Sequence, residues 1–391
     1  MAFVLRPAVS EAEIGLYVHW PFCESKCPYC DFNSHAAGAV GAVDQKRWRH
    51  ALLAELGHYA AETTDRTLTS IFFGGGTPSL MDAETVGALV EAAHRHWTCA
   101  DDIEITLESN PSSAEAQRFA AYRDAGVNRL SLGVQSLNDA ALRFLGRVHD
   151  AGQAMEALER ARAAFPRVSI DLIYARPGQT VAEWREELTE AIARAGEHVS
   201  TYQLTIEPGT AFHREGVCPA DGDTGADLWD VTQEITSKAG LPAYEISNHA
   251  RPGAECRHNI AVWQGMDYIG IGPGARGRLT TGGVTETTRQ TRMPDKWLAA
   301  VVAAGHATIE RTSLDVAERA EELLMLGLRL TDGIDRERFL TRSAVAIEDI
   351  VDPDGFARMI DGGFIEDDGK RVRATADGRP RLDAVLRQLL I

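Results

Sequence analysis

Three cysteines stand close together near the start of the chain, with the spacing Cys-x3-Cys-x2-Cys. They are Cys23, Cys27 and Cys30, and they follow a short apolar run that predicts a strand. Thiolates are the usual protein ligands of iron–sulfur clusters, and three thiolates in one loop can bind three irons of a [4Fe-4S] cluster. The fourth iron is then left open to another ligand.

An open iron has a chemical consequence. An amino acid can bind it through its amine and carboxylate, and S-adenosylmethionine (SAM) bound in this way would place its sulfonium beside the cluster. One electron would then break a carbon–sulfur bond of SAM. The alternative is a structural zinc site, which needs four ligands. No second Cys-x2-Cys pair is present, so His35 or a distant cysteine would have to supply the fourth ligand.

Glycines and polar residues occur where the next expected strands end. Residues 74–77 read Gly-Gly-Gly-Thr, and glycine lets the backbone approach a ligand closely. Carboxylates and amides can accept hydrogen bonds from ribose hydroxyls and from the SAM amine, and an arginine can pair with a carboxylate. The candidates are Glu108, Gln135 and Asp171 on the third, fourth and fifth expected strands, and Arg147 after the fourth.

These residues must be positioned by a repeated unit of strand and helix. The expected strands cover residues 16–19, 70–73, 103–107, 129–134, 169–174 and 201–206, and the expected helices cover 45–61, 83–96, 114–125, 152–164 and 181–194. This alternation predicts parallel strands, and in a parallel barrel the chemistry gathers at their carboxyl ends. We therefore expect an α/β fold with a partial (β/α)6, TIM-like barrel that is open on one side.

The pattern changes after the sixth strand. We assign residues 1–243 to the barrel and the glycine-rich residues 244–293 to an irregular connector. Residues 294–391 contain an apolar helical stripe followed by a hairpin pattern around Asp368 and Gly369. They predict a small C-terminal helical domain that is similar to a winged helix.

Composition limits the partners and the compartment. Forty basic and 57 acidic residues give a net charge of −17, which repels polyphosphate, so we expect no nucleic-acid partner. Neither a membrane span of about 20 apolar residues nor an N-terminal signal core is present. The other cysteines, Cys99, Cys218 and Cys256, are scattered, which is not typical of a disulfide framework. We expect a cytoplasmic protein.

Several ordered segments resemble the HemN-like branch of the radical SAM superfamily: LYVHWPFCESKCPYCDFNSH, GGGTPSL, ESNP, RLSLGVQS and DLIYARPGQT. The resemblance covers residues 15–283, and residues 294–391 resemble the family's HemN C-terminal domain. It implies a radical SAM barrel with a [4Fe-4S] cluster and SAM as cofactors. It also implies that Tyr17, Gly75 and Glu108 contact the cluster-bound SAM. A further set matches positions that contact a second SAM: Tyr29, Gly76, Thr77, Gln135, Arg147 and Asp171.

Within this family the chain resembles the heme chaperones more than the oxygen-independent coproporphyrinogen III dehydrogenases. The dehydrogenases carry a further cysteine where this chain has Phe32. Residues 256–263 are similar to the chaperone motif HNxxYW, which makes His258 the candidate heme ligand, although Val262 replaces the tyrosine. Arg276 stands where the chaperones usually have histidine. His258 could instead satisfy backbone groups in a loop, and Cys256 is an alternative soft ligand.

The resemblance implies three functions. The first is a heme chaperone that binds the cluster, SAM and heme and passes heme to an apo-protein. Respiratory and membrane-associated proteins are candidate acceptors, and a homodimer is one possible assembly. The second is an oxygen-independent coproporphyrinogen III dehydrogenase, and the third is a HemN-like radical SAM methyltransferase. Whether the chain is an enzyme stays open, with the heme chaperone as the first expectation.

Overall fold

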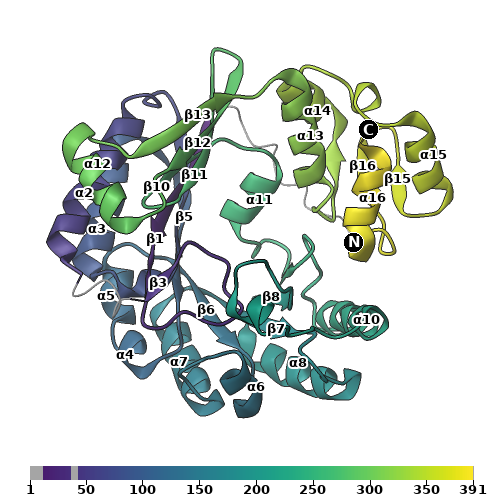
Figure 1. The fold of residues 1–391 in the computed structure, drawn as a ribbon, viewed down its shortest axis with the longest axis horizontal. Helices are drawn as coiled ribbons and strands as arrows, with labels where there is room; N and C mark the ends of the chain where they lie inside the picture. Colours follow the sequence, from purple (N-terminus) through teal and green to yellow (C-terminus); the bar gives the residue numbers. More distant parts are fainter. Residues whose placement is uncertain (1–11, 37–42, 391) are drawn as a thin grey trace.

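The computed structural model of the chain describes residues 12–36 and 43–390. Its main body is a curved eleven-stranded sheet in the order β13-β12-β11-β10-β1-β4-β5-β6-β7-β8-β9 (Figure 1). The six expected strands lie side by side and run parallel, which confirms the predicted α/β fold. They are β1 (Glu13–Trp20), β4 (Thr67–Gly75), β5 (Thr98–Ser109), β6 (Arg129–Gln135), β7 (Arg167–Tyr174) and β8 (His198–Gln203).

Helices connect these strands and cover the outer, convex face of the sheet (Figure 1). The apolar side chains between sheet and helices form one large core, which holds the strand ends in place. The helix expected at 114–125 is divided into two short helices, with residues 117 and 118 between them in a turn. The helices are α2 (Gln45–Ala60), α3 (Ala83–His96), α4 (Ser113–Ala116), α5 (Phe119–Asp124), α6 (Asp139–Phe144), α7 (Ala151–Ala164), α8 (Val181–Ala195), α9 (Ala211–Arg214) and α10 (Gly222–Lys238).

Residues 244–293, where the sequence predicts an irregular connector, are largely regular in the structure. β10 extends the sheet parallel to β1, β11 and β12 follow as antiparallel strands, and β9 pairs with β8. The glycines that suggested an irregular chain instead allow close backbone contact, since a Cβ on Gly270 would lie 1.9 Å from Arg276 O. The elements are β9 (Asn248–Ala250), α11 (Arg257–Trp263), β10 (Tyr268–Ile271), β11 (Arg276–Thr281) and β12 (Val284–Gln290).

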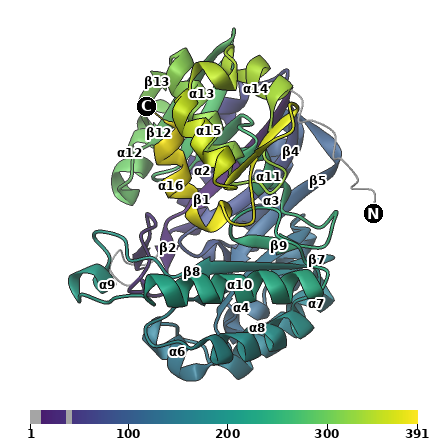
Figure 2. The same ribbon diagram turned by 90° about the vertical axis from the view of Figure 1, so that its right-hand side faces the viewer.

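The C-terminal part has a hydrophobic core of its own, beginning at α13. The expected start at residue 294 lies earlier, because α12 (Pro294–Ala304) and β13 (Thr308–Ser313) still pack on the large sheet. The unit combines helices with a three-stranded sheet, as expected for a winged-helix-like domain, and appears in yellow-green to yellow in Figure 2. Its elements are α13 (Val316–Gly327), β14 (Ile334–Asp335), α14 (Arg336–Ser343), α15 (Pro353–Asp361), β15 (Ile365–Asp367), β16 (Arg371–Ala374) and α16 (Leu382–Leu389).

Two observations concern the compartment. Among the residues that the structure describes, no helix has both the length and the apolar character that a membrane crossing requires. Residues 1–11, which include most of the start where the sequence predicts no signal core, lie outside the described residues. The cytoplasmic location therefore stays a prediction.

Candidate cluster and cofactor site

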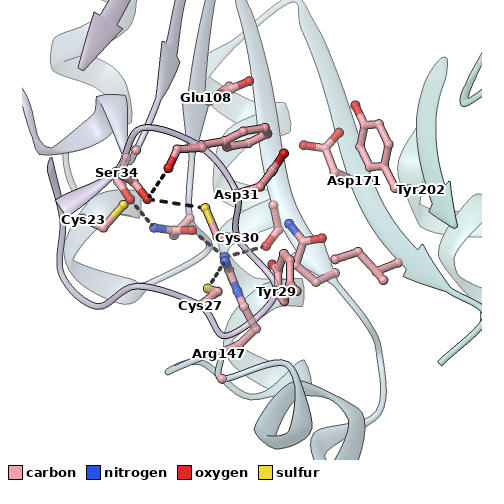
Figure 3. Close-up of a pocket in the computed structure, with 18 of the residues that line it drawn as sticks. Cys23, Cys27, Tyr29, Cys30, Asp31, Ser34, Glu108, Arg147, Asp171 and Tyr202 are labelled. Carbon is pink, nitrogen blue, oxygen red and sulfur yellow. Dashed lines mark hydrogen bonds between the residues drawn. The ribbon is translucent and has the colours of Figure 1, made fainter. Parts of the chain in front are cut away.

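A cavity of about 370 Å³ lies at the carboxyl ends of the parallel strands (Figure 3). Its lining includes the three cysteines of the Cys-x3-Cys-x2-Cys motif. It also includes most of the residues proposed from the sequence to bind SAM: Tyr29, Gly75, Gly76, Thr77, Glu108, Gln135, Arg147 and Asp171. Tyr17 and His258 line an adjoining cavity of about 260 Å³, which shares Glu108 and Asp171 with the first.

The three thiols lie on one loop that follows β1. Cys23 is buried in the two-residue strand β2 (Phe22–Cys23), and burial raises the pKa of its thiol. The Cys30 sulfur lies 3.4 Å from Ser34 Oγ, and the Cys27 sulfur accepts a hydrogen bond from Arg147 Nη1 at 3.4 Å. All three cysteines are free of disulfide bonds. The guanidinium of Arg147 and the hydroxyl of Ser34 can therefore stabilise negatively charged thiolates, the form in which cysteine binds a metal cluster.

Hydrogen bonds within the cysteine loop and to its neighbour fix its shape. Lys26 Nζ donates to Phe32 O and Ser34 O, each at 3.2 Å, and so bridges the two sides of the loop. Asn33 Nδ2 donates to Pro273 O at 2.8 Å, in the turn between β10 and β11. The loop is thus held on the sheet independently of any bound metal.

A zinc ion would need four protein ligands, whereas the loop supplies three cysteines. Within 12–36 and 43–390, no group of three or more His, Cys, Asp and Glu side chains is arranged so that it could hold one metal ion. The donor set of three free thiols therefore fits a cluster.

The glycine turn brings the end of β4 against the cysteine loop. Gly75 has a φ of 113°, which favours glycine. A Cβ on Gly76 would lie 2.8 Å from Phe22 O and 3.0 Å from the Cys23 sulfur, so any side chain there would displace the loop. Gly75 and Gly76 therefore line the cavity with backbone atoms alone, and their contact with SAM stays a prediction.

Two carboxylates face the cavity from the strands beyond the glycine turn, across from the cysteines in Figure 3. Burial, followed by the negative charge of Asp171, raises the pKa of Glu108 to about 8. Burial also raises the pKa of Asp171, although Ser131 Oγ lies 3.2 and 3.1 Å from its two carboxylate oxygens. A cationic group bound between the two carboxylates would relieve their repulsion, so this wall suits the amine of SAM.

Gln135 and Arg147 form the wall nearest to β6. Gln135 has a φ of 68°, a strained conformation for a residue with a side chain. Its buried Oε1 accepts no hydrogen bond from the residues that the structure describes, so it is available to a donor on a ligand. Arg147 Nη2 donates to Asn110 Oδ1 and, at 3.1 Å, to Gly133 O.

Sequence reasoning missed some of the lining residues. Ser131 precedes Gly133 by two positions on β6, so the alternation of strand side chains could have placed it on the cavity face. Tyr202 belongs to a predicted strand, but nothing in its spacing distinguished it from the neighbouring residues. Asp31 and Ser34 also line the cavity because of how the cysteine loop folds, which the sequence does not reveal.

His258 is buried on α11, with 8% of its surface exposed. Its Nδ1 lies 3.1 Å from Ser70 Oγ, and its ring stacks on Phe72 at 5.0 Å between centroids. Burial lowers its pKa to about 4, so the imidazole is neutral and can act as a metal ligand.

Of the other residues singled out around His258 in the sequence, Cys256 and Arg276 do not line its cavity. The Cys256 thiol donates to Glu104 Oε1 at 3.3 Å, and burial raises its pKa to about 12. It does not line the cavity of His258, so the structure disfavours Cys256 as a ligand there. Arg276 is exposed on β11. Val262 and Trp263 line the cavity beside His258.

The chain matches two protein-family models. Residues 17–191 match the Radical SAM superfamily, and residues 314–381 match the HemN C-terminal domain. The chain is 41% identical over 342 residues to the mitochondrial Radical S-adenosyl methionine domain-containing protein 1 of Mus musculus, which covers 85% of this chain and 77% of that protein. It is 35% identical over 380 residues to Heme chaperone HemW of Escherichia coli, which covers 96% of this chain and 98% of that protein.

Among solved structures, the fold is similar to that of the coproporphyrinogen III oxidase HemN from Escherichia coli, described as a radical SAM enzyme. The TM-score is 0.79, and the match covers 96% of this chain and 89% of that one. Because only 22% of the aligned residues are identical, this likeness shows the fold alone.

Proposed function

Because the chain belongs to the HemN-like radical SAM family that includes the heme chaperones HemW, we propose that it is itself a heme chaperone. In this proposal it binds a [4Fe-4S] cluster, SAM and heme, and it passes heme to an acceptor protein. The observation that carries it is the cavity with three free thiols on one side and two carboxylates on the other. The 35% sequence identity to Heme chaperone HemW of Escherichia coli over 96% of this chain supports heme as the ligand that is bound and transferred.

In this proposal, Cys23, Cys27 and Cys30 would ligate three irons of the cluster and leave the fourth to SAM. When bound, the cluster supplies one electron to the SAM sulfonium. Glu108 and Asp171 would hold the SAM amine and ribose from the opposite wall, and the turn that contains Gly75 would contact its methionyl end. The remaining SAM contacts are proposed as the sequence predicts them, at Tyr17, Tyr29, Gly76, Thr77, Gln135 and Arg147.

We propose His258 as the heme ligand. A neutral imidazole suits heme iron, and the pKa lowered to about 4 keeps this one neutral. Because Nδ1 is engaged with Ser70, Nε2 would be the atom that binds iron. The aromatic ring of Trp263, which lines the same cavity, could cover the porphyrin plane.

The proposed partner is an apo-protein that accepts heme, in the cytoplasm or at a membrane facing it. The net charge of −17 argues against nucleic acid. Whether two copies associate is part of the same proposal, since a homodimer would bring two heme sites together.

The two enzymatic alternatives would consume SAM and change a tetrapyrrole. Phe32, at the position of the further cysteine in the dehydrogenases, is 59% exposed and lines the cavity mouth. Its phenyl ring cannot replace a thiol as a proton donor or metal ligand. This difference favours the chaperone over the dehydrogenase.

The proposed function is tested by an anaerobic heme titration of cluster-loaded protein, followed by absorbance, beside an assay for 5′-deoxyadenosine. We expect heme binding, and we expect that neither protoporphyrinogen nor a methylated product forms when SAM, a reductant and coproporphyrinogen III are supplied. His258→Ala should weaken heme binding by about tenfold or more, while His213→Ala, which changes an exposed histidine on α9, should not. Heme binding that is equal in both variants would remove His258 from the proposal, and protoporphyrinogen formation would select the dehydrogenase.

A further inference from the structure

The helix that carries His258 covers the cavity beside this side chain. Its helix, α11, packs between β4 on the sheet and α13 of the C-terminal unit (Figure 1). The cavity of about 260 Å³ beside His258 is smaller than the roughly 300–1,000 Å³ typical of small-molecule sites. A tetrapyrrole joins four rings in one plane and is larger than this cavity alone, so a movement of α11 would widen its access to the imidazole.

Two arginines of the C-terminal unit hold one carbonyl just after the end of α11. Gly265 O accepts a hydrogen bond from Arg319 Nη2 at 2.8 Å and a second from Arg342 Nη1. Arg319 is only 5% exposed, and Glu322 fixes its Nη1 at 2.8 Å. Gly265 has a φ of 70°, and a Cβ there would lie 2.1 Å from Leu323 Cδ2. The carbonyl is therefore held in one defined position against α13.

A third arginine of the C-terminal unit covers the tryptophan at the end of α11. The guanidinium carbon of Arg329 lies 4.4 Å from the centroid of the Trp263 ring, a distance typical of a cation–π contact. Arg329 Nη2 is also paired with the buried Glu245 at 3.4 Å. Trp263 lines the His258 cavity, so this contact holds part of the cavity wall.

We propose that Arg319, Arg329 and Arg342 are positioning residues that latch α11 over the His258 cavity, and that this latch opens to admit a tetrapyrrole to His258. That the latch admits heme rests on the proposed function, whereas the contacts that form the latch do not depend on it.

Hydrogen–deuterium exchange of the full chain, with its cluster loaded, tests the latch directly. In Arg342→Ala and in Arg329→Ala we expect the amides of α11 to exchange about tenfold faster, because each change removes a contact made by a charged group. Arg319→Lys keeps the buried positive charge and should give a smaller increase. The control is Arg336→Ala, which removes an arginine of α14 that pairs with Glu348 and Asp367, away from α11.

The second readout is the rate of heme binding, followed by absorbance after rapid mixing. We expect it to rise in Arg342→Ala and Arg329→Ala and to stay unchanged in Arg336→Ala. Unchanged exchange in α11 would overturn the latch. Faster amide exchange in α11 with an unchanged rate of heme binding would show that the latch does not control heme access to His258. If neither the natural chain nor any variant binds heme, the proposed function fails, and the exchange data still decide whether the latch exists.

Discussion

Arg147 joins the cysteine loop to the strands on the far side of the cavity. Its guanidinium donates to the Cys27 sulfur, to Gly133 O and to Asn110 Oδ1. A positive charge beside a cluster stabilises the reduced form, which carries the additional negative charge. We predict that Arg147→Ala lowers the reduction potential of the cluster by about 60 mV, equivalent to a tenfold change for a one-electron couple.

A redox titration followed by electron paramagnetic resonance measures this potential. Arg143→Ala is the matched control, because Arg143 lies on the neighbouring helix α6 and is exposed. An equal shift in both variants would mean that the contact with Cys27 has no specific effect.

Glu108 should give the SAM-free protein a characteristic pH dependence. Folding raises the pKa of this carboxyl from 4.5 to about 8 through burial and the charge of Asp171. Between these two pH values the folded chain keeps a proton that the unfolded chain has released. The free energy of unfolding should therefore fall as the pH rises from about 4.5 to about 8, and Glu108→Gln should remove this decrease.

Thermal unfolding of both proteins at about pH 5, 6.5 and 8 measures the effect. The natural chain should lose stability relative to Glu108→Gln as the pH increases. A difference that does not vary with pH would show that the Glu108 carboxyl is already ionised in the folded protein.

At the residue scale, the sequence was most informative where spacing defines chemistry. The Cys-x3-Cys-x2-Cys motif and the polar strand ends could be read because the carboxyl ends of parallel strands share one edge. The burial of His258 could not be read. It depends on how α11 packs across the sheet, which no local pattern encodes.

At the scale of the elements, the turn that follows β4 has no room for a side chain beside the cysteine loop. A Cβ on Gly76 would overlap Phe22 O and approach the Cys23 sulfur, so Gly76→Ala must push the cysteine loop outward. Overpacking of this kind costs about 1–3 kcal/mol, and we predict that the variant retains about half of the natural iron content or less.

Gly57→Ala provides the control for this change. Gly57 lies inside α2, and a Cβ there meets no atom within 4 Å. It should keep its full iron content and gain about 0.5–1 kcal/mol of stability, since alanine suits a helix interior better than glycine. Iron and sulfide analysis after reconstitution compares the two variants, and equal iron content would contradict a tight contact at Gly76.

The predictable elements are those with a clear periodic pattern. The six parallel strands alternate with amphipathic helices, and the sequence places them within a few residues. β10, β11 and β12 were not predicted, because the glycines at positions such as Gly270 favour irregular chain when read locally. In the structure those glycines admit a neighbouring backbone, a contact that only tertiary packing defines.

At the scale of the whole molecule, two hydrophobic cores meet at α11. The large sheet carries the cysteine cavity, while the C-terminal unit contacts the wall of the His258 cavity at residues 257–265 and, through Arg329, the buried Glu245. The sequence predicted both units, but not this connection, because the arginines involved are far from α11 in the chain. The two shared carboxylates, Glu108 and Asp171, place the cavities side by side and couple any ligand in one to the charge in the other.

The central claim is that three thiolates hold a cluster whose fourth iron is open to SAM. Electron paramagnetic resonance of the anaerobically reconstituted and reduced protein, recorded with and without SAM, tests it most directly. We predict the signal of a reduced [4Fe-4S] cluster, with g values that change when SAM is added and a signal that is lost in Cys27→Ala. A signal that SAM leaves unchanged, or bound zinc in place of iron, would contradict the claim.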